Sequence, residues 1–297
     1  MHQNLQTMKN ALLFLFSILV FSSCSDDDQG TTPDVQQNDP TLLAMAVFNP
    51  GATNETHWKF DDDGILTDIT SANGTVLKHF EYDSQGRLTQ ANFFGTTPEN
   101  FVFTYDSNNR IASVNGMVFT YNTTSGTYIQ DFEDPIVGAE FDYFDRYEFN
   151  VDASGRLVSE VGIYLSSDGN YDTAGANAAY QNANTVSLWS YGGDSSEGYT
   201  YDSHNNPLKA ATDAIRRAFA VTHFGSYHDK FLGGMYSSGN NPVTQHYASE
   251  DPESHEFEYE YNANGLPFSC VLKNFYLGNP DGQAQYINYY YQGDVQP

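Results

Sequence analysis

This chain of 297 residues has little positive charge and little cysteine. Its 12 Lys and Arg face 38 Asp and Glu, which gives a formal net charge of −26. Such a surface repels nucleic acid and anionic membrane surfaces, so we expect no nucleic-acid partner. The two cysteines, Cys24 and Cys270, are too few for the disulfide framework typical of secreted proteins, and Cys270 is predicted to be a small buried residue. Stability must therefore come from a hydrophobic core.

The common catalytic and metal-binding motifs are also missing. Residues 193–198 approach a Gly-x-Ser-x-Gly elbow, but Glu197 occupies the second glycine position. The eight histidines form no His-Glu-x-x-His pair. Asp168, Asn170 and Asp172 place oxygen atoms at alternate positions, as calcium loops do, although the glycine and the final glutamate of an EF-hand are lacking. We therefore expect no enzyme and no required cofactor. These three residues are a calcium candidate, with a polar surface loop as the alternative.

Aromatic residues, in contrast, make up 15% of the chain, and many follow a repeated pattern. Each copy has an aromatic residue at position i and a second at i+2, where one copy has Val151, then Asp or Asn, a short turn and an aliphatic residue. The clearest copy is residues 80–88 (FEYDSQGRL), and others begin at Trp58, Phe103, Phe149, Tyr199 and Tyr259. Because side chains alternate between the two faces of a strand, each aromatic pair lies on one face.

The residues after each aromatic pair predict a tight turn. Asp or Asn can bond the backbone two residues on, and Gly three residues after it tolerates positive φ. This chemistry is typical of a type I turn closed by a left-handed residue. Each copy therefore predicts one β-hairpin, with its aliphatic side chain facing the core and its Arg facing water. A lone hairpin is marginal in water, so the copies must pair or pack together.

These observations predict an all-β fold in which antiparallel β-hairpin repeats form one large curved or partly closed sheet. The uneven spacing of the copies excludes a strictly regular solenoid. After Pro207, apolar residues recur at helical spacing, which predicts one short amphipathic helix near residues 208–221. Its Lys209, Arg216 and Arg217 are expected on a solvated face, and docking of an acidic partner is the alternative.

The N-terminus predicts export and acylation. Lys9 precedes an almost wholly apolar stretch at residues 11–21, which is too short to span a bilayer. The sequence Ser22-Ser23-Cys24 that ends this stretch resembles a bacterial lipobox, in which cleavage precedes the cysteine and the cysteine is acylated. An ordinary secreted protein is the alternative. Both Met1 and Met8 remain candidates for the start.

The predicted organisation has three parts. Residues 1–23 are a lipoprotein signal peptide, residues 24–40 are the acylated cysteine and a flexible acidic tether, and residues 41–297 are a single β-repeat domain. Residues 25–28 (SDDD) in the tether resemble the acidic export tag of Bacteroidota surface lipoproteins, with a merely solvated linker as the alternative. We therefore expect the lipid membrane as a partner through Cys24.

The repeat itself resembles a known type. Tyr-Asp followed by Gly-Arg-Leu resembles the YD repeat of RHS-type proteins. The ordered set of residues 199–208, the helix, residues 238–243 and residues 259–267, together with the lipobox, resembles uncharacterised Bacteroidota surface lipoproteins with degenerate YD repeats. This resemblance covers most of the chain. It implies a β scaffold anchored by lipid in the outer membrane and facing outward, and it transfers no catalytic residue.

The sequence therefore favours a non-enzymatic surface scaffold for binding or adhesion, with a glycan or a protein as ligand. Consecutive Tyr289, Tyr290 and Tyr291 cannot all point inward, so an outward ring there is the preferred ligand contact, and edge packing is the alternative. Two other functions stay open. One is a hydrolase or metal-dependent enzyme with its site in an insertion at residues 164–198, and the other is a structural envelope component.

Overall fold

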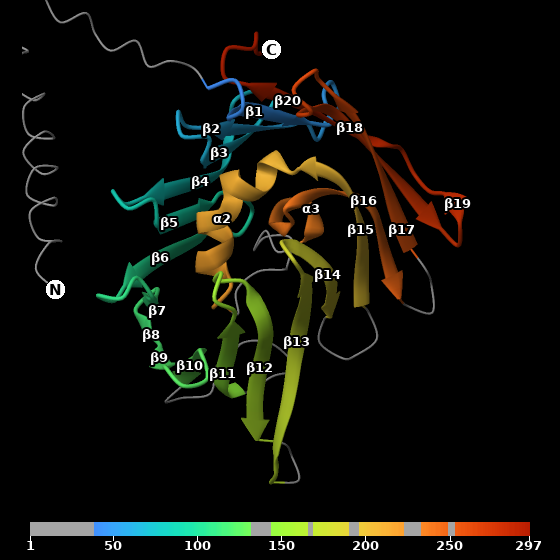
Figure 1. Ribbon diagram of the computed structural model, residues 1–297. Coiled ribbons are helices and arrows are strands. Elements are labelled where there is room, and N and C mark those ends of the chain that lie inside the picture. Colours follow the sequence, from blue (N-terminus) through green and yellow to red (C-terminus); the bar gives the residue numbers. More distant parts are fainter. Residues whose placement is uncertain (1–38, 132–143, 166–168, 190–195, 223–232, 249–252) are drawn as a thin grey trace, which may run out of the picture. The chain divides into compact units, whose positions relative to one another are not determined.

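Antiparallel strands dominate the computed structural model, which describes residues 39–131, 144–165, 169–189, 196–222, 233–248 and 253–297 (Figure 1). These residues belong to a unit that spans Asn38–Pro297. Cys24 lies outside the described residues. The strands in this described part are β1 (Leu43–Phe48), β2 (Thr56–Phe60), β3 (Leu66–Ser71), β4 (Val76–Tyr82), β5 (Leu88–Phe93), β6 (Glu99–Tyr105), β7 (Ile111–Val114), β8 (Met117–Val118), β9 (Thr120–Asn122), β10 (Thr127–Asp131), β11 (Phe144–Val151), β12 (Leu157–Leu165), β13 (Tyr171–Gln181), β14 (Asn184–Trp189), β15 (Ser196–Asn205), β16 (Asn240–Ala248), β17 (Glu253–Tyr261), β18 (Pro267–Tyr276), β19 (Asn279–Pro280) and β20 (Gln285–Tyr291).

The sheet is a long meander that turns back on its own beginning. Successive strands pair antiparallel around the unit, and β20 lies between β18 and β1, so the last strand pairs with the first. At another junction β8 pairs with β7 and β9 pairs with β10, and only Phe119 separates β8 from β9. The predicted all-β fold with one large curved, partly closed sheet is confirmed.

Five copies of the repeat build the same turn. In each, the backbone N–H of the turn residue donates to the carbonyl four residues on, and its side-chain Oδ1 accepts from the N–H groups two and four residues on, at 2.8–3.1 Å. The residue three positions on has positive φ and is Gly in four copies and Asn109 in the other. The predicted hairpin turn is therefore confirmed. The turn residues are Asp61, Asp83, Asp106, Asp152 and Asn262.

The two aromatic residues of a repeat have different roles. The first is part of the core, as Phe80 and Phe103 show with exposed fractions of 2% and 3%. The second lies nearer the turn and forms a hydrogen bond to the preceding repeat. In one copy, the Tyr105 hydroxyl donates to the Leu88 carbonyl at 2.7 Å. Equivalent bonds join Tyr82 to Leu66, Tyr180 to Leu157, Tyr201 to Thr185 and Tyr291 to Pro267. Each such bond ties one hairpin to its neighbour.

The arginine after the turn does not simply face water, which corrects the prediction. Arg87 donates from Nε to the Asp83 carboxylate of its own turn at 2.7 Å, and its guanidinium lies 4.4 Å from the ring centre of Tyr105 in the next repeat. Arg110 over Tyr121 and Arg156 over Tyr180 repeat the arrangement at 4.4 and 4.2 Å. Cation–π contacts therefore add a second link between neighbouring repeats. The aliphatic residue next to each Arg is buried, as predicted.

Two helices are inserted between β15 and β16. The helix α2 (Pro207–Phe219) confirms the helix predicted near residues 208–221, and the short α3 (Gly234–Ser237) was not predicted. Asn206 caps α2, because its Oδ1 accepts from the Leu208 N–H, while its Nδ2 donates to the Met235 carbonyl at 2.7 Å. The cap residue therefore fixes α2 to α3.

The helices fill the concave side of the sheet (Figure 1). The ring of Phe219 at the end of α2 lies 5.0 Å from that of Phe101 and 5.9 Å from that of Phe93. The ring of Tyr236 in α3 stacks on Trp58 at 5.5 Å. Because these rings come from distant parts of the chain, one hydrophobic core joins sheet and helices. Cys270 belongs to this core and is fully buried, as predicted.

We expect Asp106→Ala to lower the free energy of unfolding by about 1–3 kcal/mol, because two backbone N–H groups and Arg110 would lose their acceptor. Urea denaturation measures this change. Asp106→Asn should retain most of the stability, because Asn262 supplies the same turn with an amide. The matched control is Asp131→Ala, whose exposed carboxylate binds only Arg146 among the described residues. Equal losses at both sites would contradict the role of the turn carboxylate.

The Asp106 carboxylate should also make the free energy of unfolding depend on pH. The hydrogen bond from Arg110 holds the pKa of the Asp106 carboxyl at about 2, below its usual 3.8. A depressed folded-state pKa means that the stabilisation is complete above pH 3.8 and is lost as the pH falls toward 2. Asp106→Asn, which cannot titrate, should flatten this part of the stability profile.

A candidate binding groove between α2 and the repeat turns

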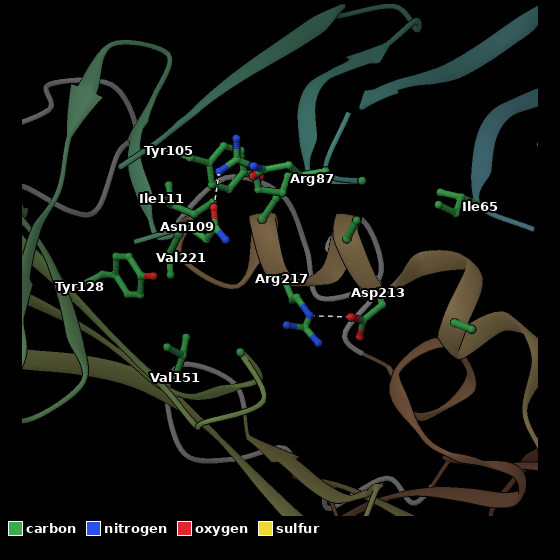
Figure 2. Close-up of a pocket in the computed structure, with 16 residues that line it drawn as sticks. Ile65, Arg87, Tyr105, Asn109, Ile111, Tyr128, Val151, Asp213, Arg217 and Val221 are labelled. Atoms are coloured by element: carbon green, nitrogen blue, oxygen red, sulfur yellow. Dashed lines mark hydrogen bonds and ion pairs between the residues drawn. The ribbon is translucent and has the colours of Figure 1, made fainter. Parts of the chain in front are cut away.

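The turns of several repeats converge on the side of α2 that faces away from the core. A cavity of about 650 Å³ lies there, and its walls include the turn residues Gly86, Asn109 and Gly155 (Figure 2). A second cavity, of about 860 Å³, is lined by other turn and loop residues, including Gly64 and Leu266. The two cavities share lining residues Ala210, Asp213 and Arg217 of α2. We refer to them together as the rim groove.

Small side chains on α2 leave this space open. Ala210, Ala214 and Ala218 recur every four residues, so they lie along one side of the helix, and all three line the first cavity. The opposite side of α2 carries core residues such as Leu208 and Ile215, both at most 1% exposed. Further apolar wall comes from residues that flank the repeat turns, Ile65, Ile111 and Val151, and from Val221 just after α2. The groove is therefore partly apolar.

One aspartate in α2 serves two arginines. The Asp213 carboxylate accepts hydrogen bonds from Arg216 and from Arg217. The side chain of Arg217 is 55% exposed and lines the groove, where Figure 2 shows it joined to Asp213. The side chain of Arg216 is only 2% exposed, and its Nε and Nη1 have no hydrogen-bond partner among the described residues. The prediction of a solvated face was therefore wrong for Arg216.

The position of Arg217 is set by a glycine in a repeat turn. A Cβ built at Gly155 would lie 3.3 Å from the Cγ of Arg217, so the side chain rests against the bare backbone of the turn. Gly155 also has φ of +73°, a value that other residues rarely adopt. The turn chemistry and the close approach therefore both favour glycine at this position.

A second arginine borders the groove from the repeat side. Arg87 donates from Nη1 to the Oδ1 of Asn109 at 2.8 Å, and this bond joins two successive turns (Figure 2). Because the amide oxygen of Asn109 is engaged, its amide nitrogen remains as a donor beside the cavity. Gln85 adds a further side-chain amide to the lining. The polar part of the wall is therefore well supplied with hydrogen-bond donors.

Burial keeps the tyrosines of this region neutral. It raises the pKa of Tyr105 well above its usual value of 10, raises that of Tyr128, and raises that of Tyr180 to about 12. None of the three is therefore a phenolate or a base near neutral pH. The described lining of the first cavity includes no Ser, Cys or His. The arrangement can hold a ligand through charge, hydrogen bonds and apolar contact.

The three tyrosines proposed from the sequence do not share one face. Tyr289 and Tyr291 are 4% and 3% exposed and belong to the core, where Tyr291 also bonds the carbonyl of Pro267. Tyr290 lies between them on the other face of β20 and is partly exposed. The alternation of the strand thus leaves Tyr290 as the member of this group that a ligand could contact. Its role as a ligand contact stays a prediction.

Only two of the three residues of the calcium candidate are among the described residues. Asp168 lies outside the described residues, while Asn170 and Asp172 are at the exposed end of the β12–β13 hairpin. Among the described residues, no group of three His, Cys, Asp or Glu could hold a metal ion. Calcium binding here stays a prediction.

The region 164–198 differs from the predicted insertion. Its described part forms β13 and β14, which pair with each other and continue the sheet from β12 to β15. Tyr180 makes the same hydroxyl bond to the preceding return strand as the tyrosines of the other repeats. The strands therefore carry a further degenerate copy of the repeat, which the sequence hid because Ala178 replaces the first aromatic residue.

Comparison with known proteins supports the repeat. Residues 60–97 match the family model described as RHS Repeat. This segment covers β3, β4 and β5 with the turns at Asp61 and Asp83, so the YD-type repeat is confirmed there. No curated protein matches the chain.

Several solved structures match this chain at low sequence identity and with low TM-scores. A porin-like protein from Bacteroides uniformis is 12% identical, with a TM-score of 0.41 over 86% of this chain and 99% of that one. A porin-like protein from Bacteroides vulgatus is also 12% identical, with a TM-score of 0.34 over 85% and 99%. The TcdB2-TccC3 complex is 13% identical, with a TM-score of 0.25, and the match covers 80% of this chain but 14% of that one.

Substitutions at Asp213 and Arg216 test how the aspartate shared by the two α2 arginines affects stability. We expect Asp213→Ala to lower the free energy of unfolding by about 3 kcal/mol, because it leaves the buried Arg216 charge without a partner. Arg216→Met should have little effect or stabilise the protein, because it removes a buried charge and Asp213 keeps Arg217. In the double variant Arg216→Met should rescue most of the loss. Urea denaturation measures all three, and additive effects would refute the coupling.

Proposed function

We propose that this protein is a non-enzymatic surface lipoprotein whose β scaffold binds a glycan in the rim groove. The observation that supports this most directly is the groove itself, in which partly apolar walls carry converging amide and guanidinium donors. Ligand sites in proteins are typically concave, of 300–1,000 Å³, and combine apolar walls with a few placed polar groups. The groove at Asp213 and Arg217 has these properties.

The shape of the groove favours a glycan over a protein surface. A stable protein interface needs roughly 800 Å² on each partner and a broad contact surface. The first cavity, at about 650 Å³, is a bounded space between one helix and several turns, suited to one or two sugar units. Sugar recognition there would rest on hydrogen bonds and charge rather than ring stacking, because Arg87 covers the Tyr105 ring. Tyr290 on the other face of the sheet is a separate candidate for stacking.

The proposed location follows from the N-terminal sequence. Acylation of Cys24 after removal of the signal would tether the β-repeat domain to the outer membrane, facing outward, through a flexible acidic segment. Among the described residues, no helix has the length and apolar character needed to cross a bilayer. Display at the cell surface would place the rim groove where external glycans are available.

We expect metabolic labelling with a palmitate analogue to mark the protein in cells and to disappear in Cys24→Ala, because the proposed acylation uses that thiol and amino group. Cys270→Ala is the matched control and should keep the label, since Cys270 is buried in the core. Protease treatment of intact cells should remove the protein if it faces outward. Labelling that persists in Cys24→Ala would disprove lipid anchoring at this residue.

A cavity-filling variant tests the binding site. We expect residues 39–297 to retain specific glycans on an array, and Ala214→Trp to abolish that binding, because an indole at Ala214 would fill the first cavity. Val158→Trp is the matched control, because Val158 is exposed on β12 outside the groove lining and should leave binding unchanged. Thermal unfolding confirms that both variants fold. Glycan binding that survives Ala214→Trp would place the site elsewhere.

A further inference from the structure

We infer that the rim groove selects acidic saccharides, and that the carboxylate or sulfate of the sugar binds at Arg217. This inference rests on the proposed function, because it specifies the class of glycan that the groove takes. It is carried by the distribution of charge around the first cavity, by the burial of Arg216 and by the donors that remain available at the cavity wall.

The charged lining of the first cavity is mainly positive. In the repeat turns, each of three arginines has its own aspartate, in the pairs Arg87–Asp83, Arg110–Asp106 and Arg156–Asp152, whereas the turn residue Asp61 has no arginine in its own turn. The charged residues that line the first cavity are Arg87, Arg217 and Asp213, which are two guanidinium ions and one carboxylate. In α2, Arg216 and Arg217 share that single carboxylate. A local surplus of one positive charge is notable in a chain with a net charge of −26.

The surplus charge is fixed in place. Arg216 is almost fully buried and pairs with Asp213, which lines the groove, so its guanidinium can neither turn to solvent nor lose its charge. Two of its nitrogen atoms have no hydrogen-bond partner among the described residues, so Asp213 compensates it incompletely. Because water screens a buried charge poorly, its effect extends to the neighbouring Asp213 and Arg217. An anion that binds Arg217 would complete the neutralisation of this group.

The groove also provides the geometry for an acidic sugar. Arg217 uses Nε to hold Asp213, which leaves its terminal nitrogens as donors on the exposed part of the side chain. Asn109 and Gln85, which carry side-chain amides, line the same cavity from the repeat turns. The apolar wall at Ile111 and Val151 can cover the carbon face of a sugar ring. The anionic group and the sugar body would therefore contact different parts of one cavity.

Matched pairs of glycans test this inference. We expect an array to show that residues 39–297 bind oligogalacturonate at least about tenfold more tightly than the corresponding neutral oligogalactose, a typical effect of a charge-assisted contact. Arg217→Ala should remove the preference for the acidic glycan, while Arg217→Lys should retain part of it. The matched control is Arg146→Ala, which removes an Arg–Asp pair on an exposed strand outside the groove lining. Titration calorimetry with the same oligosaccharides provides the affinities.

The outcomes separate this inference from the proposed function. Equal binding of acidic and neutral glycans, with no effect of Arg217→Ala, would overturn the acidic selectivity and leave glycan binding intact. Failure to bind any glycan would overturn both. Competition by an acidic peptide, with no binding of uronate or sulfated glycans, would overturn the saccharide assignment. Selective binding that Arg217→Ala abolishes and Arg146→Ala preserves would support the inference in full.

Discussion

The structure depends on one interaction: in each repeat turn, the side-chain oxygen of an Asp or Asn accepts hydrogen bonds from two backbone N–H groups. These two hydrogen bonds hold a five-residue turn in shape. The turn then sets the register shift between the paired strands next to it. With the register set, the first aromatic residue enters the core and the second reaches the carbonyl of the preceding repeat. In three copies the same carboxylate also holds an arginine over the next tyrosine. Local turn chemistry is thereby converted into contacts between repeats.

A consequence of this regularity is that several turns gather at one rim of the curved sheet. The concave side needs filling, and α2 and α3 fill it with aromatic and aliphatic side chains. At the rim, however, α2 presents alanines to the turns, so the helix and the sheet do not close against each other. The groove is thus the space left between a regular repeat and a single inserted helix. The proposed binding site therefore lies where the repeat is interrupted by the helix.

The sequence predicted the hairpins well because their signal is local. Period-two aromatics and the Asp-to-Gly turn carry the information within nine residues, and the helix of α2 likewise shows its own periodicity. The burial of Arg216 could not be predicted, because helical spacing indicates which residues share a side but not what the chain places against it. The contacts of Arg87 and Arg156 with tyrosines of the next repeat depend on how neighbouring hairpins pair, which no single nine-residue copy specifies. The repeat copy at Tyr180 was hidden by its alanine and by a different turn, in which only Asn182 and Ala183 separate β13 from β14.

The same turn that organises the fold also accounts for the charge of the groove. Four of the five turns bring an aspartate to the rim, and arginines paired with Asp83, Asp106 and Asp152 keep the rim from becoming strongly negative. The helix adds Lys209, Arg216 and Arg217 but only one aspartate, so a surplus of positive charge comes from α2. Burying Arg216 costs stability, since a charge in a poorly solvated place is held with fewer hydrogen bonds than water would give it. A well-packed apolar residue could fill the same space at no such cost. Under the proposed selectivity for acidic glycans, the charge of Arg216 would serve ligand binding at the neighbouring Arg217 rather than folding.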